Sequence, residues 1–140
     1  MAQWIGALAL VPALLAVGCG ERKLSPGGYA GVELDPPAAK PEFVLSDTRG
    51  APFDFQARTS GYLTLLFFGY THCPDVCPVH MANLAAVLNR LPDEVSRRIK
   101  VVFVTTDPAR DTPERLSSWL AKFDPDFVGL TGSPEALVQA

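Results

Sequence analysis

The chain has few of the side chains that bind soft metals or carry redox chemistry. Its 140 residues include three cysteines and two histidines, and two of those cysteines and both histidines lie within residues 67–81. It also lacks the clustered basic residues of a nucleic-acid-binding surface, and its formal charge is −3. No internal repeat or low-complexity tract is present, and the length allows one domain at most once a leader is removed.

The N-terminal apolar run is too short for a typical membrane-spanning helix. Residues 5–18 form an uncharged run of 14 residues, whereas a spanning helix needs about 20. Because the run ends in small residues, we expect residues 1–18 to be a signal peptide. The next residue, in "LLAVGC", resembles the lipobox of bacterial lipoproteins, so Cys19 is predicted to carry the lipid. An uncleaved membrane anchor is the alternative, and both readings place the rest of the chain outside the cytoplasm of a bacterial cell.

A polar linker follows the leader, and several predicted strands follow the linker. Residues 19–41 are rich in Gly, Pro and polar side chains and are predicted to be a flexible tether. Two short runs, "EFVL" and "PFDF", are separated by turn residues and predict a β-hairpin. The apolar runs 63–68, 99–106 and 127–132 predict three buried strands.

Helices are predicted between and after these strands. The first runs from Pro78 to Leu91 and is ended by Pro92. The second follows Thr112 as N-cap, and the third follows Ser133. The buried face of the second helix is predicted to consist of Leu116, Trp119, Leu120 and Phe123. Strands that alternate with helices imply parallel pairing, so residues 42–140 are predicted to form an α/β domain.

The stretch "FFGYTHCPDVCPVHM" joins the first buried strand to the first helix. It places Cys73 and Cys77 where open α/β sheets form their functional crevices. Unpaired N–H groups and the positive end of the helix dipole favour thiolates there, so we expect both thiol pKa values to be lowered. The spacing of four residues predicts that both sulfurs lie on one side of the chain, one turn apart.

Two neighbouring thiols in an exported protein allow two uses. They can bind a soft ion such as Cu(I), or they can form a disulfide. A purely structural disulfide across one turn closes a very small loop and adds little stability. The position and spacing therefore favour a functional pair over a structural bridge.

The other polar residues near this stretch carry weaker signals. For His72 and His80 we favour a non-ligating, partly exposed side chain over a metal ligand. Asp107, Arg110 and Asp111 form a charged cluster after the second buried strand. Capping and loop-holding ion pairs are the favoured interpretation for Arg110 and Asp111, while a role in positioning a metal loop is left open for Asp107.

The motif "GYTHCPDVCP", followed by "TTDPARDTPERL" and "LTGS", resembles the SCO/SenC family. These are thioredoxin-like proteins that assemble the copper A centre of cytochrome c oxidase. The resemblance covers roughly residues 41–139. It implies that Cys73 and Cys77 are the two copper-binding cysteines, that copper is bound, and that the partner is the oxidase subunit carrying the copper A site.

The same resemblance implies an incomplete thioredoxin-like domain. The third ligand of the family is a histidine in the C-terminal part of the domain, and neither His72 nor His80 occupies its position. We therefore expect C-terminal strands, a helix and the histidine-bearing region to be missing from this chain. A chain of this extent is predicted to aggregate readily and to hold Cu(II) poorly.

Three functional hypotheses follow. The first is a membrane-tethered copper metallochaperone that uses Cys73 and Cys77. The second is an enzyme, a thiol–disulfide oxidoreductase acting on an oxidase subunit or another exported protein with the same two residues. The third is a truncated gene product with neither activity.

Overall fold

The computed structural model describes residue 28 and residues 31–140. The predicted signal peptide, Cys19 and part of the predicted tether lie outside the described residues. The chain divides into two units, residues 1–38 and residues 39–140, and every described helix and strand belongs to the second. Within the described residues, no helix is long and apolar enough to cross a membrane.

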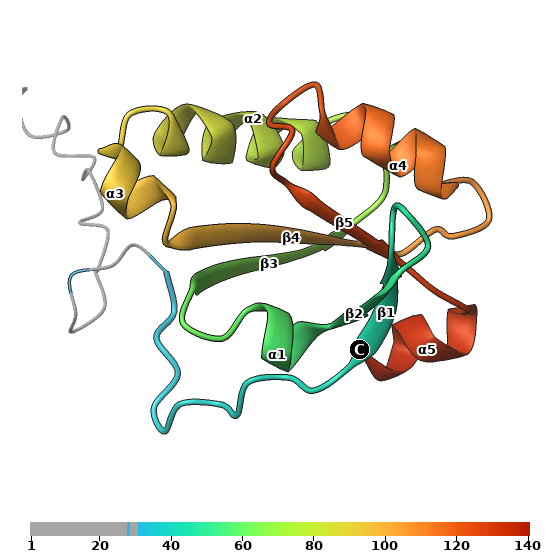
Figure 1. Cartoon of the computed structure of the whole chain (residues 1–140), viewed down its shortest axis with the longest axis horizontal. Coiled ribbons are helices and arrows are strands. Elements are labelled where there is room, and N and C mark those ends of the chain that lie inside the picture. The colour runs from blue at the N-terminus through green and yellow to red at the C-terminus, as the bar shows by residue number, and fades with distance from the viewer. Residues whose placement is uncertain (1–27, 29–30) are drawn as a thin grey trace, which may run out of the picture. The chain divides into compact units, whose positions relative to one another are not determined.

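One mixed sheet organises the second unit (Figure 1). Its strand order is β2-β1-β5-β4-β3. The parallel arrangement predicted for the three strands is confirmed, because β3 pairs with β4 and β4 with β5 in parallel. The predicted burial of β3 is wrong, because Leu63 and Phe68 are exposed and the side chains between them are only partly buried. The predicted hairpin is also confirmed, and its first strand pairs antiparallel with β5. The strands are β1 (Val44–Asp47), β2 (Pro52–Asp54), β3 (Leu63–Gly69), β4 (Ile99–Thr105) and β5 (Val128–Thr131).

Helices cover both faces of this sheet (Figure 1). Two of them, α2 and α4, lie over one face, and the short helices α1 and α5 lie over the other. The helices are α1 (Phe55–Arg58), α2 (Val76–Leu88), α3 (Asp93–Ser96), α4 (Pro113–Leu120) and α5 (Pro134–Gln139). The chain thus has the α/β layering that the alternation of strands and helices predicts.

Alternation along β4 divides the core between the two faces. Val101 and Phe103 point into the cluster under α2 and α4, whereas Val102 and Val104 point into the cluster under α1 and α5. All four are nearly inaccessible to solvent. The Phe103 ring lies 5.2 Å from the ring of Trp119. Because β4 is buried on both faces, its apolar run is continuous, as expected for a central parallel strand.

The ends of α2 differ from the prediction. The helix begins at Val76, two residues before Pro78, and ends at Leu88, so Leu91 lies beyond it. Proline is tolerated throughout the first turn, where the N–H groups have no intrahelical partner, and it therefore does not mark the helix start. Pro92 restricts the residue before it to extended conformations, so the helix has to end earlier.

The second predicted helix agrees better with the structure. Thr112 caps α4 by accepting the N–H of Arg115 at 3.3 Å, and Leu116 and Leu120 are buried as predicted. Phe123 lies beyond the last helical residue but packs against the same core cluster. The helices α1 and α3 were not predicted, because four residues are too few to show a helical period.

Candidate functional site

The cysteine motif lies at the carboxyl edge of the parallel strands. β3 ends at Gly69 and α2 begins at Val76, so Cys73 lies in the connecting loop and Cys77 in the first turn of the helix. Two backbone hydrogen bonds fix the path of the loop between β3 and α2. The N–H of Thr106 donates to the Gly69 carbonyl at 2.7 Å, and the N–H of Cys73 donates to the Tyr70 carbonyl at 3.2 Å. The motif is therefore at the sheet edge where its sequence position predicts it.

The two sulfurs occupy different environments. Both cysteines are free thiols; Cys77 is 5% exposed, and Cys73 is partly exposed. The backbone N–H of Cys77 donates to the sulfur of Cys73 at 3.3 Å. Asp75, the N-cap residue of α2, makes no capping hydrogen bond with its side chain. The Cys73 sulfur thus satisfies a free N–H at the start of the helix, as a capping oxygen normally does.

These environments shift the two thiol pKa values in opposite directions. The pKa of Cys73 is lowered, chiefly by the backbone N–H of Cys77 and then by the Cys77 thiol and the N–H groups of Asp75 and Val76. The pKa of Cys77 is raised, chiefly by burial. The prediction that both thiols would be more acidic than usual is confirmed for Cys73 and wrong for Cys77. Desolvation disfavours the charged form more than the helix start favours it.

The last residue of β3 gives the buried sulfur its space. A Cβ atom placed on Gly69 would lie 3.0 Å from the Cys77 sulfur, 2.8 Å from a ring carbon of Phe67 and 3.1 Å from a ring carbon of Phe103. A side chain at this position would therefore displace the thiol or the aromatic rings. The absence of a Cβ at Gly69 allows Cys77 to pack directly against the end of the strand.

A buried carboxylate ties the cysteine loop to the end of β4. Asp111 is 1% exposed, and one of its oxygens accepts the N–H of Thr71 at 2.9 Å and the hydroxyl of Thr105 at 2.7 Å. The other oxygen accepts the Thr71 hydroxyl at 2.5 Å. Burial alone raises the pKa of this carboxyl, but the hydrogen bonds from Thr71 and Thr105 outweigh it and leave the pKa lowered. Asp111 is thus a buried anion whose charge is stabilised by donors from the loop and the strand.

His72 lies between this carboxylate and a cation. Its Nδ1 is 3.7 Å from Asp111, and its Nε2 is 2.7 Å from a guanidinium nitrogen of Arg115. A guanidinium has no acceptor, so the Nε2 atom accepts and the imidazole carries its proton on Nδ1. The histidine next to Cys73 is therefore engaged by its protein neighbours on both ring nitrogens.

Comparison with known proteins identifies the family of the chain. A family model described as SCO1/SenC matches residues 32–140. The chain belongs to the SCO1/SenC family. It spans 48% and 33% of the length of the first two curated relatives it matches.

Three solved structures resemble this SCO1/SenC chain. ScoI of Bradyrhizobium japonicum with copper bound is 37% identical, with 72% of this chain and 63% of that chain covered and a TM-score of 0.65. Yeast Sco1 with copper bound is 33% identical, with 73% and 56% covered and a TM-score of 0.66. A SCO1/SenC family lipoprotein of Bacillus anthracis is 30% identical, with 68% and 58% covered and a TM-score of 0.58. The fold of the second unit is therefore thioredoxin-like, as the resemblance implied.

The remaining candidate residues of the SCO1/SenC chain do not extend the thiol pair into a larger donor cluster. His80 is exposed and packs its ring 5.5 Å from that of Phe67. Asp107 pairs with Arg110 in an exposed ion pair, while Asp111 faces the loop instead. In the part of the chain that the structure describes, no group of three or more His, Cys, Asp or Glu side chains is placed to hold a metal ion.

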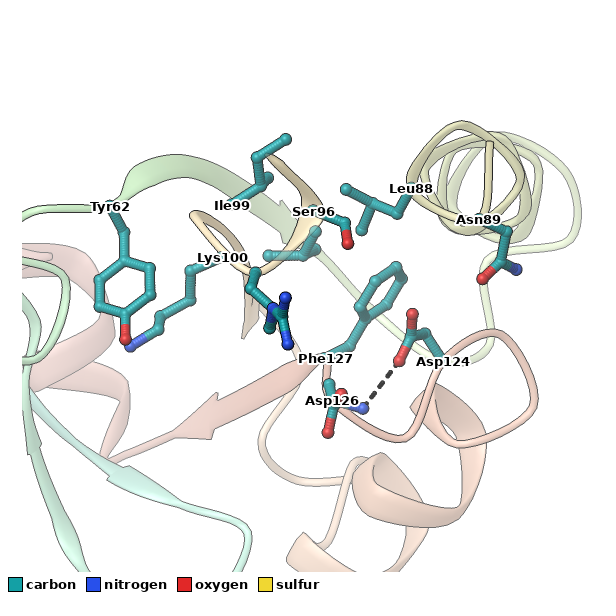
Figure 2. Close-up of a pocket in the computed structure, with 11 residues that line it drawn as sticks. Tyr62, Leu88, Asn89, Ser96, Ile99, Lys100, Asp124, Asp126 and Phe127 are labelled. Carbon is teal, nitrogen blue, oxygen red and sulfur yellow. Dashed lines mark hydrogen bonds between the residues drawn. The ribbon is translucent and has the colours of Figure 1, made fainter. Parts of the chain in front are cut away.

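A separate cavity lies at the opposite end of the same strands. It has a volume of about 370 Å³, and Figure 2 shows the side chains that line it. Tyr62 precedes β3, and Lys100 near the start of β4 places its ammonium 3.9 Å from the centre of the Tyr62 ring. The pKa of Lys100 is lowered by burial and then by the charges of Arg58 and Lys40. No cysteine or histidine lines this cavity, and both cysteines of the described residues lie at the carboxyl edge.

Some site residues have no clear signal in the sequence. Thr71 and Thr105 act through hydrogen bonds to Asp111, and threonine next to a motif is too common to single out. Gly69 has one usable signal, because a glycine that ends an apolar strand beside a functional loop often marks a close approach.

Proposed function

We propose that this SCO1/SenC protein is a metallochaperone that carries copper to the copper A site of cytochrome c oxidase. Cys73 and Cys77 are the proposed thiolate ligands. The observation that carries the proposal is the pair of free thiols at the sheet edge, held together by the hydrogen bond from the Cys77 N–H to the Cys73 sulfur. Two solved relatives that hold copper support the choice of metal.

The donor set suits Cu(I) as cargo. Thiolates select soft ions, and two sulfurs are enough for Cu(I), whereas Cu(II) or Zn(II) needs further ligands. Binding removes the thiol protons, and the positive charge of the metal offsets the cost of a buried thiolate at Cys77. Cys73 is the more accessible sulfur, so we expect an incoming ligand of the acceptor to replace Cys73 first. Copper then moves by ligand exchange without any change in oxidation state.

Membrane tethering completes the proposal. We propose that residues 1–18 are removed as a signal peptide and that Cys19 carries the lipid. In this arrangement a flexible tether of residues 19–41 connects the lipid to the domain, residues 42–140, outside the cytoplasm. A flexible chain of this length has a mean end-to-end distance of about 25 Å. The Bacillus anthracis relative described as a lipoprotein supports this arrangement.

The opposite pKa shifts favour a second candidate, a thiol–disulfide oxidoreductase. In this reaction the Cys73 thiolate attacks a substrate disulfide, forms a mixed disulfide and releases one substrate thiolate. Cys77 then loses its proton and attacks the Cys73 sulfur, which releases the second substrate thiolate and leaves a Cys73–Cys77 disulfide. Turnover requires a dithiol reductant to return the pair to its reduced state.

Anaerobic titration of the reduced full chain with Cu(I), against a chromophoric chelator, tests the chaperone function. We expect one equivalent to bind to the unmodified chain, and tight binding to disappear in both Cys73→Ser and Cys77→Ser. The control is Cys19→Ser, which leaves the pair intact and should bind normally. Retention of copper by either variant of the pair would show that the two sulfurs do not form the site.

The same preparations separate the second candidate from the first. Copper-free protein is mixed with a disulfide peptide and an excess of dithiothreitol, and the release of peptide thiols is followed. Turnover that depends on Cys73 in a chain that binds no copper would support the oxidoreductase instead. A chain that neither binds copper nor turns over the peptide would match the third hypothesis, a product with neither activity.

A further inference from the structure

A pocket of about 550 Å³ lies between the loop that follows β3 and the outer face of α4. The lining residues from α4 and the turn after it follow a helical stripe, at positions i, i+3, i+4 and i+7. The loop contributes one residue, two positions before Cys73. The pocket therefore adjoins the loop that carries the more accessible thiol. The residues that line it are Thr71, Arg115, Ser118, Trp119 and Lys122.

Both charged side chains of this pocket are cations. Arg115 and Lys122 are exposed, and neither forms an ion pair with a carboxylate in the part of the chain that the structure describes. No Asp or Glu lines the pocket, although the whole chain has a formal charge of −3. The pocket is thus a local positive site on an acidic protein, and its charge complements that of a negatively charged partner.

A hydrogen bond orients the Arg115 guanidinium toward the cysteine loop. One of its nitrogens donates to His72 Nε2 at 2.7 Å, and His72 in turn lies 3.7 Å from the buried carboxylate of Asp111. A guanidinium has several N–H donors in a fixed planar arrangement, so this bond leaves other donors available for a ligand. An arginine that is already oriented in this way is suited to bind a carboxylate through paired hydrogen bonds.

An aromatic ring lies between the two cations along the stripe. Trp119 is partly buried, and its ring packs 5.2 Å from that of Phe103 and 4.9 Å from that of Phe123. The part of the ring that lines the pocket offers an apolar contact to a bound chain. Tryptophan and arginine are the residues that most often anchor a partner protein in an interface.

The pocket lies away from β3, the last strand on its side of the sheet. α4 packs on β5, and Trp119 packs on Phe103 of β4. Because β5 and β4 precede β3 in the sheet order, a strand added beside β3 would extend the sheet away from α4. The pocket is therefore a feature of the face formed by α4 and the cysteine loop, and not of the sheet edge.

We propose that this pocket binds an acidic segment of the copper acceptor, with carboxylates of the segment on Arg115 and Lys122. The inference rests on the proposed copper transfer and adds the surface on which the acceptor docks. A segment bound here places the acceptor beside Cys73, the sulfur that an incoming ligand is expected to replace first. The opposite charges also speed the encounter of the two proteins, an effect that salt screens.

Peptide binding tests the pocket without copper. The full chain, reduced and metal-free in a non-ionic detergent, is titrated with a hexaglutamate peptide, and the indole N–H signal of Trp119 is followed by nuclear magnetic resonance. Because the chain has two tryptophans, Trp4→Phe assigns this signal. We expect a saturable shift with hexaglutamate and none with hexalysine. A shift with both peptides, or with neither, would overturn the proposal.

Charge-changing variants identify the two cations. Lys122→Glu should weaken hexaglutamate binding roughly tenfold, because it replaces an attraction with a repulsion. Arg115→Gln should also weaken it, and circular dichroism checks that both variants are folded. The matched control is Lys40→Glu, which makes the same charge change at an exposed lysine over the ring of Phe55 and should bind normally. An equal loss in the control would show that only the net charge matters, and the pocket would be wrong.

Copper transfer then tests the acceptor as the occupant. The Cu(I)-loaded chain is mixed anaerobically with the copper A domain of the oxidase from the same organism, at low and at high salt. Lys122→Glu should slow transfer roughly tenfold at low salt, and the difference should disappear at high salt. Normal Cu(I) binding with an unchanged transfer rate would overturn the docking site and leave the chaperone function intact. An unmodified chain that binds no Cu(I) would overturn the proposed function, and with it the acceptor as the occupant.

Discussion

The carboxylate of Asp111 accepts the backbone N–H of Thr71 at 2.9 Å, across 40 positions in the sequence. It also accepts the Thr71 hydroxyl, so one buried side chain holds the loop that leads into Cys73. The segment that follows β4 thereby positions the loop that follows β3. This contact links the stability of the fold to the geometry of the thiol site.

Replacement of Asp111 should destabilise the protein by about 3 kcal/mol, because Asp111→Ala removes the acceptor of the buried Thr105 hydroxyl and of two partly buried donors of Thr71. Urea unfolding followed by circular dichroism measures the loss. Asp126→Ala removes an exposed aspartate and is the control, with an expected change below about 0.5 kcal/mol. A loss of similar size in both variants would show that Asp111 has no special structural role.

The contribution of Asp111 should depend on pH. Its pKa is lowered in the folded protein, because the hydrogen bonds from Thr71 and Thr105 outweigh the effect of burial. The stabilisation is therefore complete above the unfolded pKa of about 4 and is lost as the pH falls through the lower, folded pKa. Urea unfolding at several pH values measures the free energy of unfolding of the unmodified chain and of Asp111→Asn. The difference between the two should become smaller as the pH falls. A difference in the free energy of unfolding that stays constant through this pH range would contradict the lowered pKa of Asp111.

The two cysteines should react with an alkylating reagent in a fixed order. Only the thiolate reacts, and the pKa of Cys73 is lowered while that of Cys77 is raised by burial. Pulsed treatment with iodoacetamide over a pH series, with peptide mass spectrometry, should show Cys73 modified at lower pH than Cys77. Urea-unfolded chain is the control, in which both sites should react alike. Faster reaction of Cys77 than of Cys73 in the folded chain would show that Cys73 is not the more acidic thiol.

A methyl group at position 69 should disturb the thiol site. In Gly69→Ala the new Cβ would crowd the Cys77 sulfur at 3.0 Å and two phenylalanine rings, so we expect a loss of about 1–3 kcal/mol. Cu(I) affinity, measured by chelator competition, should fall as well. Gly31→Ala is the matched control, because nothing lies within 4 Å of its added Cβ. Unchanged stability and copper affinity in Gly69→Ala would show that Cys77 has more room than the packing indicates.

The sequence predicted the sheet well because its strands carry strong, separate signals. The apolar runs of β3 and β4 form a parallel pair, although only β4 is buried on both faces, and Thr112 and Ser133 cap helices as expected. The start of α2 was placed too late, because proline is acceptable anywhere in a first turn. The pairing of β1 with β5 was not predicted, since no local pattern specifies which strands far apart in the sequence become neighbours.

The site was predicted in position but only partly in chemistry. The motif spacing located Cys73 and Cys77 at the sheet edge, and the helix start accounts for the lowered pKa of Cys73. The opposite shift at Cys77 depends on burial, and the mostly apolar sequence of α2 does not specify which of its residues are buried. Asp111 was grouped with its charged neighbours, yet its partners come from a loop that only the folded chain brings close.

The hydrogen bond from the Cys77 N–H to the Cys73 sulfur gives the site a built-in reporter. The acceptor strength of that sulfur differs between a thiol, a metal-bound thiolate and a disulfide, so the strength of this hydrogen bond should differ among the three states. The electronic environment of the Cys77 amide should therefore depend on whether the pair is empty, metal-bound or oxidised. We expect the nuclear magnetic resonance signal of that amide to distinguish the empty, the metal-bound and the oxidised protein without any label at the thiols.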